Sequence, residues 1–207
     1  MYTGALIIFT GANGAGKTSI INELVDYYKL MHITCKVYKF PNRSNNINGK
    51  RIDDYLNNRI SIESKYDILD MFAKDRETVR KQIVHDMING CMVFCDRYVY
   101  DAIAYHMPLN ATPKQVQLYS NVIGYFDKKM PMPTIVYVIN GNHLHRRKGE
   151  NDELFHYRGI KTKQIYNNIL NVVKLQAPKY TLLINHDNHL DIVVNYIIND
   201  INSSILI

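Results

Sequence analysis

The sequence contains no tryptophan, only three cysteines and no long hydrophobic run. Cys35, Cys91 and Cys95 are odd in number and lack the spacing of metal ligands, and two of them lie in one apolar stretch. This usage is typical of a reduced intracellular protein with cysteines in its core, and we expect no zinc site. A chain of 207 residues is long enough to form one globular domain without disulfides or metals, whereas two full domains would be crowded.

A signal peptide or membrane span is not predicted either. Residues 1–4 carry no positively charged side chain, and the apolar run that follows, residues 5–9, is far too short for either segment. We therefore expect a cytosolic or nuclear protein with no membrane partner.

Long runs of Lys or Arg are also absent. The chain has 25 Lys and Arg against 19 Asp and Glu, and its net charge of +6 suits an anionic partner. That charge does not distinguish a phosphate metabolite from a nucleic acid or an acidic surface. The tightest basic cluster, Arg146-Arg147-Lys148, is too small for a nucleic-acid-binding stripe, so we expect no nucleic-acid partner.

Short β-rich runs alternate with helical stretches. The runs are nearly continuously apolar, and the segments between them are long enough for crossover helices, which favours a parallel sheet. The predicted fold class is α/β, one domain over residues 1–207 with a five-stranded doubly wound parallel sheet and helices on both faces. The predicted strands are residues 5–9, 34–40, 91–95, 134–139 and 180–184, and the predicted helices are residues 17–30, 62–87, 113–126, 161–175 and 189–201.

Two polar, turn-rich stretches, residues 42–50 and 140–159, are predicted to be irregular. Long irregular segments in a compact domain are more often functional than idle, so these stretches are the first candidates for moving parts.

A phosphate-binding motif follows the first predicted strand. The stretch from Gly11 to Thr18, GANGAGKT, matches G-x-x-x-x-G-K-[ST] and continues directly into the first predicted helix. In this arrangement backbone N–H groups and a helix N-terminus surround a phosphate, Lys17 reaches the β and γ phosphates, and the Thr18 hydroxyl binds Mg²⁺. The motif predicts nucleoside triphosphate binding by Gly11, Asn13, Gly14, Ala15, Gly16, Lys17, Thr18 and Ser19.

Polar residues follow the second and third predicted strands, where ligands bind in open α/β sheets. Phe40-Pro41-Asn42-Arg43-Ser44 follows the second strand and Asp96-Arg97 follows the third. Asp96 is placed to hold Mg²⁺ through water, and Arg97 to neutralise transferring phosphoryl oxygens. A local ion pair at the strand end is the alternative.

Phe72 and Arg76 are four residues apart on a predicted helix and therefore share a face. A nucleobase could stack on Phe72 while Arg76 donates to a base carbonyl. Phe72 also fits an apolar stripe with Leu69, Val79 and Ile83, so core packing is the alternative.

Taken together, these motifs resemble those of the thymidylate kinases, P-loop kinases that phosphorylate dTMP with ATP. The resemblance covers roughly the first half of the chain, and residues 4–7 and 52–56 are especially similar to poxvirus-type members. It rests on the P-loop, Phe40-Pro41-x-Arg43-Ser44, Gly49-Lys50 with Asp54-Tyr55-Leu56, Phe72-x-x-x-Arg76, and Asp96-Arg97-Tyr98 with Ala104-Tyr105.

The resemblance implies a role for each matching residue. Arg43 and Arg97 would hold the acceptor phosphate, Phe72 and Arg76 would read the base, and Tyr105 would lie against the sugar. The implied dTMP site comprises Asn13, Phe40, Arg43, Phe72, Arg76, Arg97, Asp101 and Tyr105, and the implied catalytic residues are Lys17, Asp96, Arg97, Arg146 and Arg147.

The resemblance also implies a lid over residues 140–159. Because Gly14 stands where some members have a P-loop Arg, Arg146 or Arg147 in the lid would supply the missing cation. It further implies Mg²⁺ with ATP as donor, a homodimer formed through the helix at 62–87, and a cytoplasmic location, in the host cytoplasm if the source is viral.

Three features depart from the family pattern, and one of them is the stretch from His106 to Lys129, which aligns poorly with the family. Asn13 stands where the P-loop usually carries Asp or Glu, and Asp101-Ala102 where Ser-Gly is usual. We therefore expect an altered acceptor site beside an intact donor site. Two alternatives stay open: a deoxynucleoside kinase or broad-specificity pyrimidine monophosphate kinase, and a catalytically weakened nucleotide-binding dimer. A nucleic-acid motor is disfavoured because the chain is short.

Overall fold

The protein contains a five-stranded parallel sheet with the strand order β2-β3-β1-β4-β5. The computed structural model describes residues 4–43, 46–141, 152–185 and 190–205. The predicted α/β fold class is confirmed, and all five strands lie where the apolar runs predicted them. They are β1 (Ala5–Gly11), β2 (Cys35–Lys39), β3 (Met92–Asp96), β4 (Ile135–Gly141) and β5 (Tyr180–Asn185).

Strand β1 lies at the centre of the sheet, and all seven of its residues are buried. Its alternate side chains enter two separate hydrophobic clusters: Leu6 and Ile8 pack into one, and Ile7 and Phe9 into the other. Successive side chains of a strand point to opposite faces, so this division shows that apolar layers cover the sheet on both sides.

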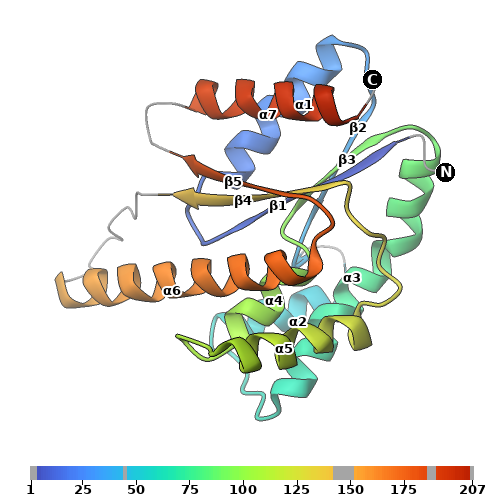
Figure 1. Ribbon diagram of the computed structural model, residues 1–207. Helices are drawn as coiled ribbons and strands as arrows, with labels where there is room; N and C mark the ends of the chain where they lie inside the picture. Colours follow the sequence, from blue (N-terminus) through green and yellow to red (C-terminus); the bar gives the residue numbers. More distant parts are fainter. Residues whose placement is uncertain (1–3, 44–45, 142–151, 186–189, 206–207) are drawn as a thin grey trace.

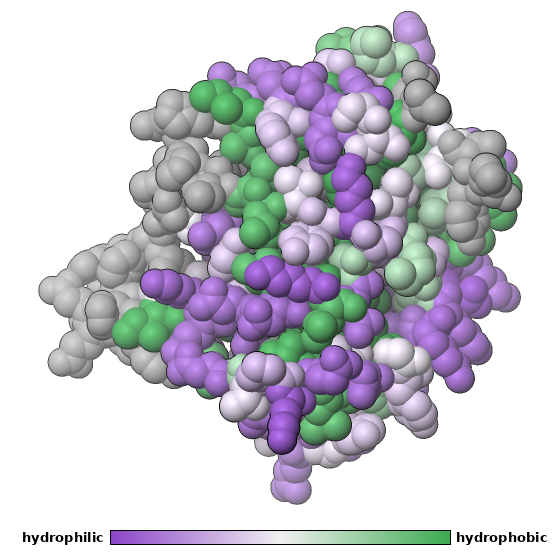
Figure 2. Space-filling view, in the orientation of Figure 1, coloured by the Kyte–Doolittle hydropathy of each residue, from purple (hydrophilic) through white to green (hydrophobic). Residues whose placement is uncertain are grey.

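Seven helices in the described part of the chain form these layers (Figure 1). Helices α1 and α7 cover one face, and the other five contribute to the larger cluster on the opposite face. On the face shown in Figure 2, hydrophilic and hydrophobic residues are interspersed. The helices are α1 (Lys17–Leu30), α2 (Ile47–Leu56), α3 (Lys65–Ile88), α4 (Val99–His106), α5 (Pro113–Phe126), α6 (Asp152–Gln176) and α7 (Leu190–Ser204).

Local signals fix several helix ends. Helix α5 begins with a capping box in which Thr112 and Gln115 exchange hydrogen bonds, with Pro113 in its first turn. The Ser64 hydroxyl accepts from the Asp67 N–H at the start of α3. Helices α1 and α5 have the predicted bounds.

Two helices were not predicted, and a third begins earlier than predicted. Helix α2 occupies the end of the stretch at 42–50 and α6 begins at Asp152, so both predicted irregular segments are partly helical. Helix α4 has eight residues, six of them buried, and therefore lacks the one-sided periodicity that predicts a helix. Helix α2 depends on Asn46, whose side chain accepts from the Gly49 N–H at 2.7 Å.

The cysteines are free thiols. Cys91 and Cys95 are buried as predicted, whereas Cys35 on the edge strand β2 is half-buried. No group of three His, Cys, Asp or Glu in the described part of the chain is arranged to hold a metal ion. None of the helices within the described ranges is long and apolar enough to cross a membrane.

Strand register brings the candidate site residues to one edge of the sheet. Asp96 at the end of β3 pairs with Phe9 on one side and with Lys39 on the other. Three segments therefore start from neighbouring points at the carboxyl edge of the parallel sheet. They are the P-loop after β1, the segment beginning with Phe40 after β2 and the segment beginning with Arg97 after β3.

Candidate active site

The P-loop connects β1 to α1 at the carboxyl edge of the sheet. Gly11 has a φ of 139°, and a Cβ at this position would lie 2.2 Å from the carbonyl oxygen of Ile139 on β4. A side chain is therefore excluded there on both conformational and steric grounds. Helix α1 begins at Lys17 with its N–H groups directed at the loop, which makes an anion-binding site.

The side chain of Lys17 turns back over the loop. Its Nζ donates to the carbonyls of Gly11 at 3.2 Å and Ala12 at 2.8 Å, and the residue is 6% exposed. Burial and the nearby charge of Arg97 lower the pKa of Lys17 to about 8. An anionic phosphate in the loop would offset both effects, because it pairs with the ammonium group.

Thr18 and Asp96, the two residues predicted to hold a metal ion, are in direct contact. The Thr18 hydroxyl donates to Oδ2 of Asp96 at 2.7 Å, and Lys39 Nζ lies 3.5 Å from the same oxygen. A hydroxyl and a carboxylate are the oxygen ligands that Mg²⁺ prefers, so this donor set fits the ion that the P-loop implies.

A cavity of about 530 Å³ lies over the P-loop. Seven of the eight residues predicted to bind the triphosphate line it. Gly11 does not, and its carbonyl instead accepts from Lys17 and Arg97. The seven P-loop and helix-start residues that line it are Asn13, Gly14, Ala15, Gly16, Lys17, Thr18 and Ser19, and the rest of its wall is formed by Lys39, Phe40, Pro41, Arg43, Asp96 and Arg97.

A second cavity, of about 360 Å³, adjoins the first. The two share Asn13, Phe40, Pro41, Arg43 and Arg97. All eight residues predicted to bind dTMP line this second cavity, namely Asn13, Phe40, Arg43, Phe72, Arg76, Arg97, Asp101 and Tyr105.

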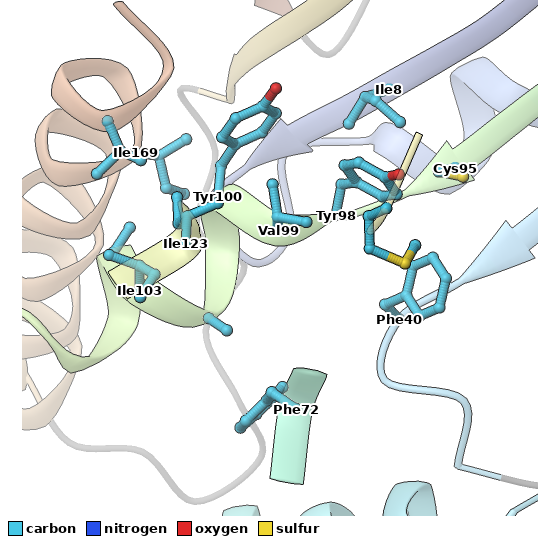
Figure 3. Close-up of a cluster of buried hydrophobic side chains, with 14 of the residues drawn as sticks. Ile8, Phe40, Phe72, Cys95, Tyr98, Val99, Tyr100, Ile103, Ile123 and Ile169 are labelled. Carbon is cyan, nitrogen blue, oxygen red and sulfur yellow. The ribbon is translucent and has the colours of Figure 1, made fainter. Parts of the chain in front are cut away.

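Phe72 belongs to the hydrophobic core and to the cavity wall at the same time. It is 8% exposed and part of the larger cluster, at whose edge Figure 3 shows it together with Phe40. Its ring meets that of His106 edge-on at 5.7 Å, and the His106 ring stacks on Tyr55 at 6.2 Å. The two interpretations of Phe72, base stacking and core packing, are therefore compatible.

Arg76 is held by a residue that the sequence did not reveal. Its Nε and Nη2 donate to the two carboxylate oxygens of Asp127 at 2.8 and 2.7 Å, and each side chain of this pair is 3% exposed. A two-point pair of this kind fixes the plane of the guanidinium group. No sequence signal identified Asp127, because it lies 51 positions away at the end of α5.

Arg43 lies in a short loop that Asp75 on α3 holds in place. Asp75 is fully buried and accepts from the Asn42 N–H at 2.9 Å and from Asn46 Nδ2 at 2.6 Å. Burial raises the pKa of Asp75, although these two hydrogen bonds oppose the shift. Arg43 itself is exposed and pairs with Asp53 of α2 at 3.1 Å.

Helix α2 packs directly on the same loop. A Cβ at Gly49 would lie 1.8 Å from the carbonyl oxygen of Asn42, so only glycine allows this approach. The Gly49-Lys50 pair of the sequence motif therefore has a structural reason, which is the placement of the segment that carries Arg43.

The guanidinium group of Arg97 makes four hydrogen bonds within the site. Its Nη1 donates to Asp101 Oδ1 at 2.6 Å and to the Gly11 carbonyl at 3.2 Å. Its Nη2 donates to Asn13 Oδ1 at 2.6 Å and to the Tyr105 hydroxyl at 3.3 Å. Burial opposes the charge of Arg97, but the Asp101 carboxylate and the Tyr105 contact raise its pKa above the usual value. The backbone of Arg97 is left-handed, with a φ of 73°.

Two further residues of the predicted dTMP site lie beside Arg97. Asp101 is 4% exposed, and its carboxylate contacts the Arg97 guanidinium. The centroid of the Tyr105 ring lies 5.2 Å from Cζ of Arg97. Asp96 and Arg97 each have an ion-pair partner near the strand end, Lys39 for Asp96 and Asp101 for Arg97, so the local ion-pair alternative stays open. Arg146 and Arg147 lie outside the described residues, as do Ser44 and residues 142–151 of the predicted lid at 140–159.

Sequence reasoning also missed His106 and Lys161, which line the second cavity. His106 Nδ1 lies 2.6 Å from the Ala102 carbonyl oxygen, and burial lowers the pKa of this histidine. A histidine at the end of an unpredicted helix gives no pattern that marks it as part of a site.

Comparisons with known proteins agree with this geometry. The thymidylate kinase family model matches residues 9–197. A protein of Invertebrate iridescent virus 6 is 35% identical over 102 residues, 49% of this chain and 47% of that protein. A thymidylate kinase of Schizosaccharomyces pombe is 34% identical over 103 residues, 49% of this chain and 48% of that protein. The aligned stretch thus spans about half the length of these two relatives.

A solved structure extends the similarity of fold to almost the whole chain. The thymidylate kinase of Candida albicans aligns with a TM-score of 0.72 and 24% identity, over 97% of this chain and 92% of that one. The family match covers both the P-loop and the second cavity. This chain therefore belongs to the thymidylate kinase family.

Proposed function

We propose that this protein is an ATP-dependent thymidylate kinase, which transfers the γ-phosphoryl group of ATP to dTMP and gives dTDP. The observation that carries the proposal is the pair of adjoining cavities that share Asn13 and Arg97. One cavity lies over the P-loop, and the other is lined by aromatic rings and arginines. A donor triphosphate and an acceptor monophosphate placed in them would meet at the shared wall.

On the donor side, the P-loop amides and Lys17 bind the ATP phosphates. Thr18 and Asp96 would hold Mg²⁺, the latter through water, and when bound the ion neutralises charge on the β and γ phosphates. Lys17 leaves its two loop carbonyls and turns to the phosphate oxygens.

On the acceptor side, Phe72 stacks on the thymine and Arg76 donates to a base carbonyl. Asp127 occupies Nε and Nη2 of Arg76, so the remaining nitrogen, Nη1, is the donor for the base. Arg43 and Arg97 hold the acceptor phosphate. The reaction is an in-line transfer driven by positioning and charge neutralisation, with no covalent enzyme intermediate.

Three further parts of the proposal rest on the family resemblance. Arg146 or Arg147 closes over the ATP phosphates from the lid, and two copies of the chain associate through α3. The enzyme is cytoplasmic, in the host cytoplasm if its source is viral. Light scattering at micromolar concentration tests the dimer: a species of only 24 kDa would refute it.

The test of the function is a coupled ATP-consumption assay with every deoxynucleoside monophosphate and with thymidine. We expect dTMP to be the best acceptor and thymidine to be inactive, because a nucleoside has no phosphate for Arg43 and Arg97. Turnover of thymidine would instead support a deoxynucleoside kinase, and equal rates with all pyrimidine monophosphates would support the broad-specificity alternative. No ATP consumption with any acceptor would refute the kinase proposal.

A further inference from the structure

The guanidinium group of Arg97 is enclosed by four acceptors at the junction of the two cavities. Three of them are neutral: the Gly11 carbonyl, the Asn13 amide oxygen and the Tyr105 hydroxyl. Only Asp101 carries a charge. The Arg97 side chain is 15% exposed, so its charge is largely desolvated and requires one well-placed anion.

Asp101 is itself fixed from its other side. Its Oδ2 accepts from the Thr10 hydroxyl at 2.9 Å and from the Tyr98 N–H at 3.1 Å, and its side chain is 6% exposed. These donors belong to the end of β1 and the start of α4. The Asp101 carboxylate is therefore fixed relative to the edge of the sheet, and it in turn fixes the position of the Arg97 guanidinium.

The charges around Arg97 have to be favourable both in the substrate-free protein and in the substrate complex. Without substrate, one carboxylate balances the buried guanidinium. With substrate, Arg97 must also attract a phosphate that carries negative charge, and a second nearby carboxylate would oppose it. Asn13 meets both needs, because its amide oxygen accepts from Arg97 without adding charge.

We propose that Asp101 is the positioning residue of Arg97 and that Asp101 and Asn13 are a matched pair, one charged and one neutral, on either side of its guanidinium. This inference rests on the proposed function, since it assigns Arg97 to the acceptor phosphate. It predicts that the site tolerates one carboxylate in contact with Arg97 and not two or none.

Asn13→Asp places a second carboxylate against Arg97. The expected result is a rise in the KM for dTMP of about tenfold, with a smaller change in kcat, because the added charge acts on the incoming phosphate. Asn121→Asp is the matched control: it adds the same charge on an exposed position of α5 and should leave the KM unchanged. An unchanged KM in Asn13→Asp would overturn the proposal.

Asp101→Asn removes the only carboxylate in the set. Arg97 keeps its attraction for phosphate but loses its anchor, so kcat should fall by about tenfold to a hundredfold while the KM for dTMP does not rise. The double variant Asn13→Asp/Asp101→Asn restores one carboxylate, and its KM for dTMP should be lower than that of Asn13→Asp alone. Additive losses in the double variant would refute the matched pair.

Two further measurements keep the inference testable if Asp101→Asn folds poorly or dTMP is not a substrate. Thr10→Val removes one anchor of Asp101 at nearly constant volume and should lower kcat without changing the KM for dTMP. In the substrate-free protein, the Nε–H signal of Arg97 in a ¹⁵N NMR spectrum should be sharp and should broaden in Thr10→Val.

A normal kcat in Thr10→Val, or an unchanged Arg97 signal, would refute the positioning role. If the natural protein binds no dTMP while the Arg97 signal still broadens in Thr10→Val, the proposed function alone is refuted.

Discussion

The donor and acceptor halves of the site are built in different ways. The P-loop is eight consecutive residues, and Lys17 makes its hydrogen bonds five and six positions back along the chain. On the acceptor side, the Arg76–Asp127 and Arg97–Asn13 contacts span 51 and 84 positions. The donor cradle is thus a local structure, whereas the acceptor cavity exists only when four helices have assembled with the segments that follow β1, β2 and β3.

Because of this difference, substitutions in the two halves should affect activity and stability differently. A substitution in the donor loop removes positive charge that would neutralise the ATP phosphates, and it leaves the hydrophobic core intact. A change among the acceptor residues removes a buried pair or a core side chain, so stability and affinity fall together. The predictions below test that division, beginning with the largest expected effect.

Lys17→Ala should lower phosphoryl transfer by about a thousandfold, because the donor phosphates lose their cation. Stability should be unchanged or slightly higher below pH 8, since burial lowers the pKa of Lys17 and charging it in the fold is costly. Turnover and thermal unfolding check the two expectations. Near-normal turnover would contradict the donor assignment, and a large drop in Tm would contradict the division between the two halves.

Asp127→Ala should destabilise the protein by about 3–5 kcal/mol, because it leaves the Arg76 guanidinium buried and unpaired. Denaturant unfolding measures the loss. The matched control is Glu77→Ala, which breaks the more exposed Arg80–Glu77 pair on α3 and should cost no more than about 1 kcal/mol. Equal losses in the two variants would show that burial of the Arg76 pair does not matter.

Phe72→Ala should weaken dTMP binding by about 1–3 kcal/mol through loss of stacking, without changing the affinity for ATP. Calorimetric titration with each nucleotide tests this. Ile83→Ala is the control, because Ile83 is a fully buried core residue of the same helix and does not line the cavity. It should reduce stability alone. A similar loss of dTMP affinity in both variants would mean that Phe72 acts only through the core.

The smallest expected effect is on pH dependence. Lys17 binds phosphate as a cation and loses its proton near pH 8 in the free protein, so kcat/KM for ATP should fall as pH rises above about 8. The fall should approach tenfold per pH unit. The fall in kcat should begin at higher pH, because bound triphosphate stabilises the ammonium form. Lys17→Arg, which stays charged, should lack the decline, and a decline of equal size in that variant would assign it to another group.

Two departures from the family pattern illustrate how far the sequence goes. Asn13 and Asp101 are each expected to alter the acceptor site, and that expectation rests on the family resemblance. The structure places both in contact with Arg97, each at 2.6 Å. No periodicity or spacing could reveal this, because the contact depends on how β1, β3 and α4 meet.

What the sequence determined by itself was the part of the protein with local causes. Nearly continuous apolar runs specified the strands, most clearly β1 and β3, in which every residue is buried. The GANGAGKT motif specified the phosphate cradle, since the loop and the helix start are adjacent in the chain. Capping residues and apolar spacing set the bounds of α5.

Only the tertiary structure decided the remainder. Helix α4 is stabilised by burial on most of its surface, so its sequence has no amphipathic signature. Asp127 became the partner of Arg76, and Asp75 the anchor of the Arg43 loop, because packing brought distant backbone segments within hydrogen-bond reach. A carboxylate in a sequence looks the same whether it ends on the surface or opposite a buried arginine, and the difference arises from desolvation, which depends on the completed fold.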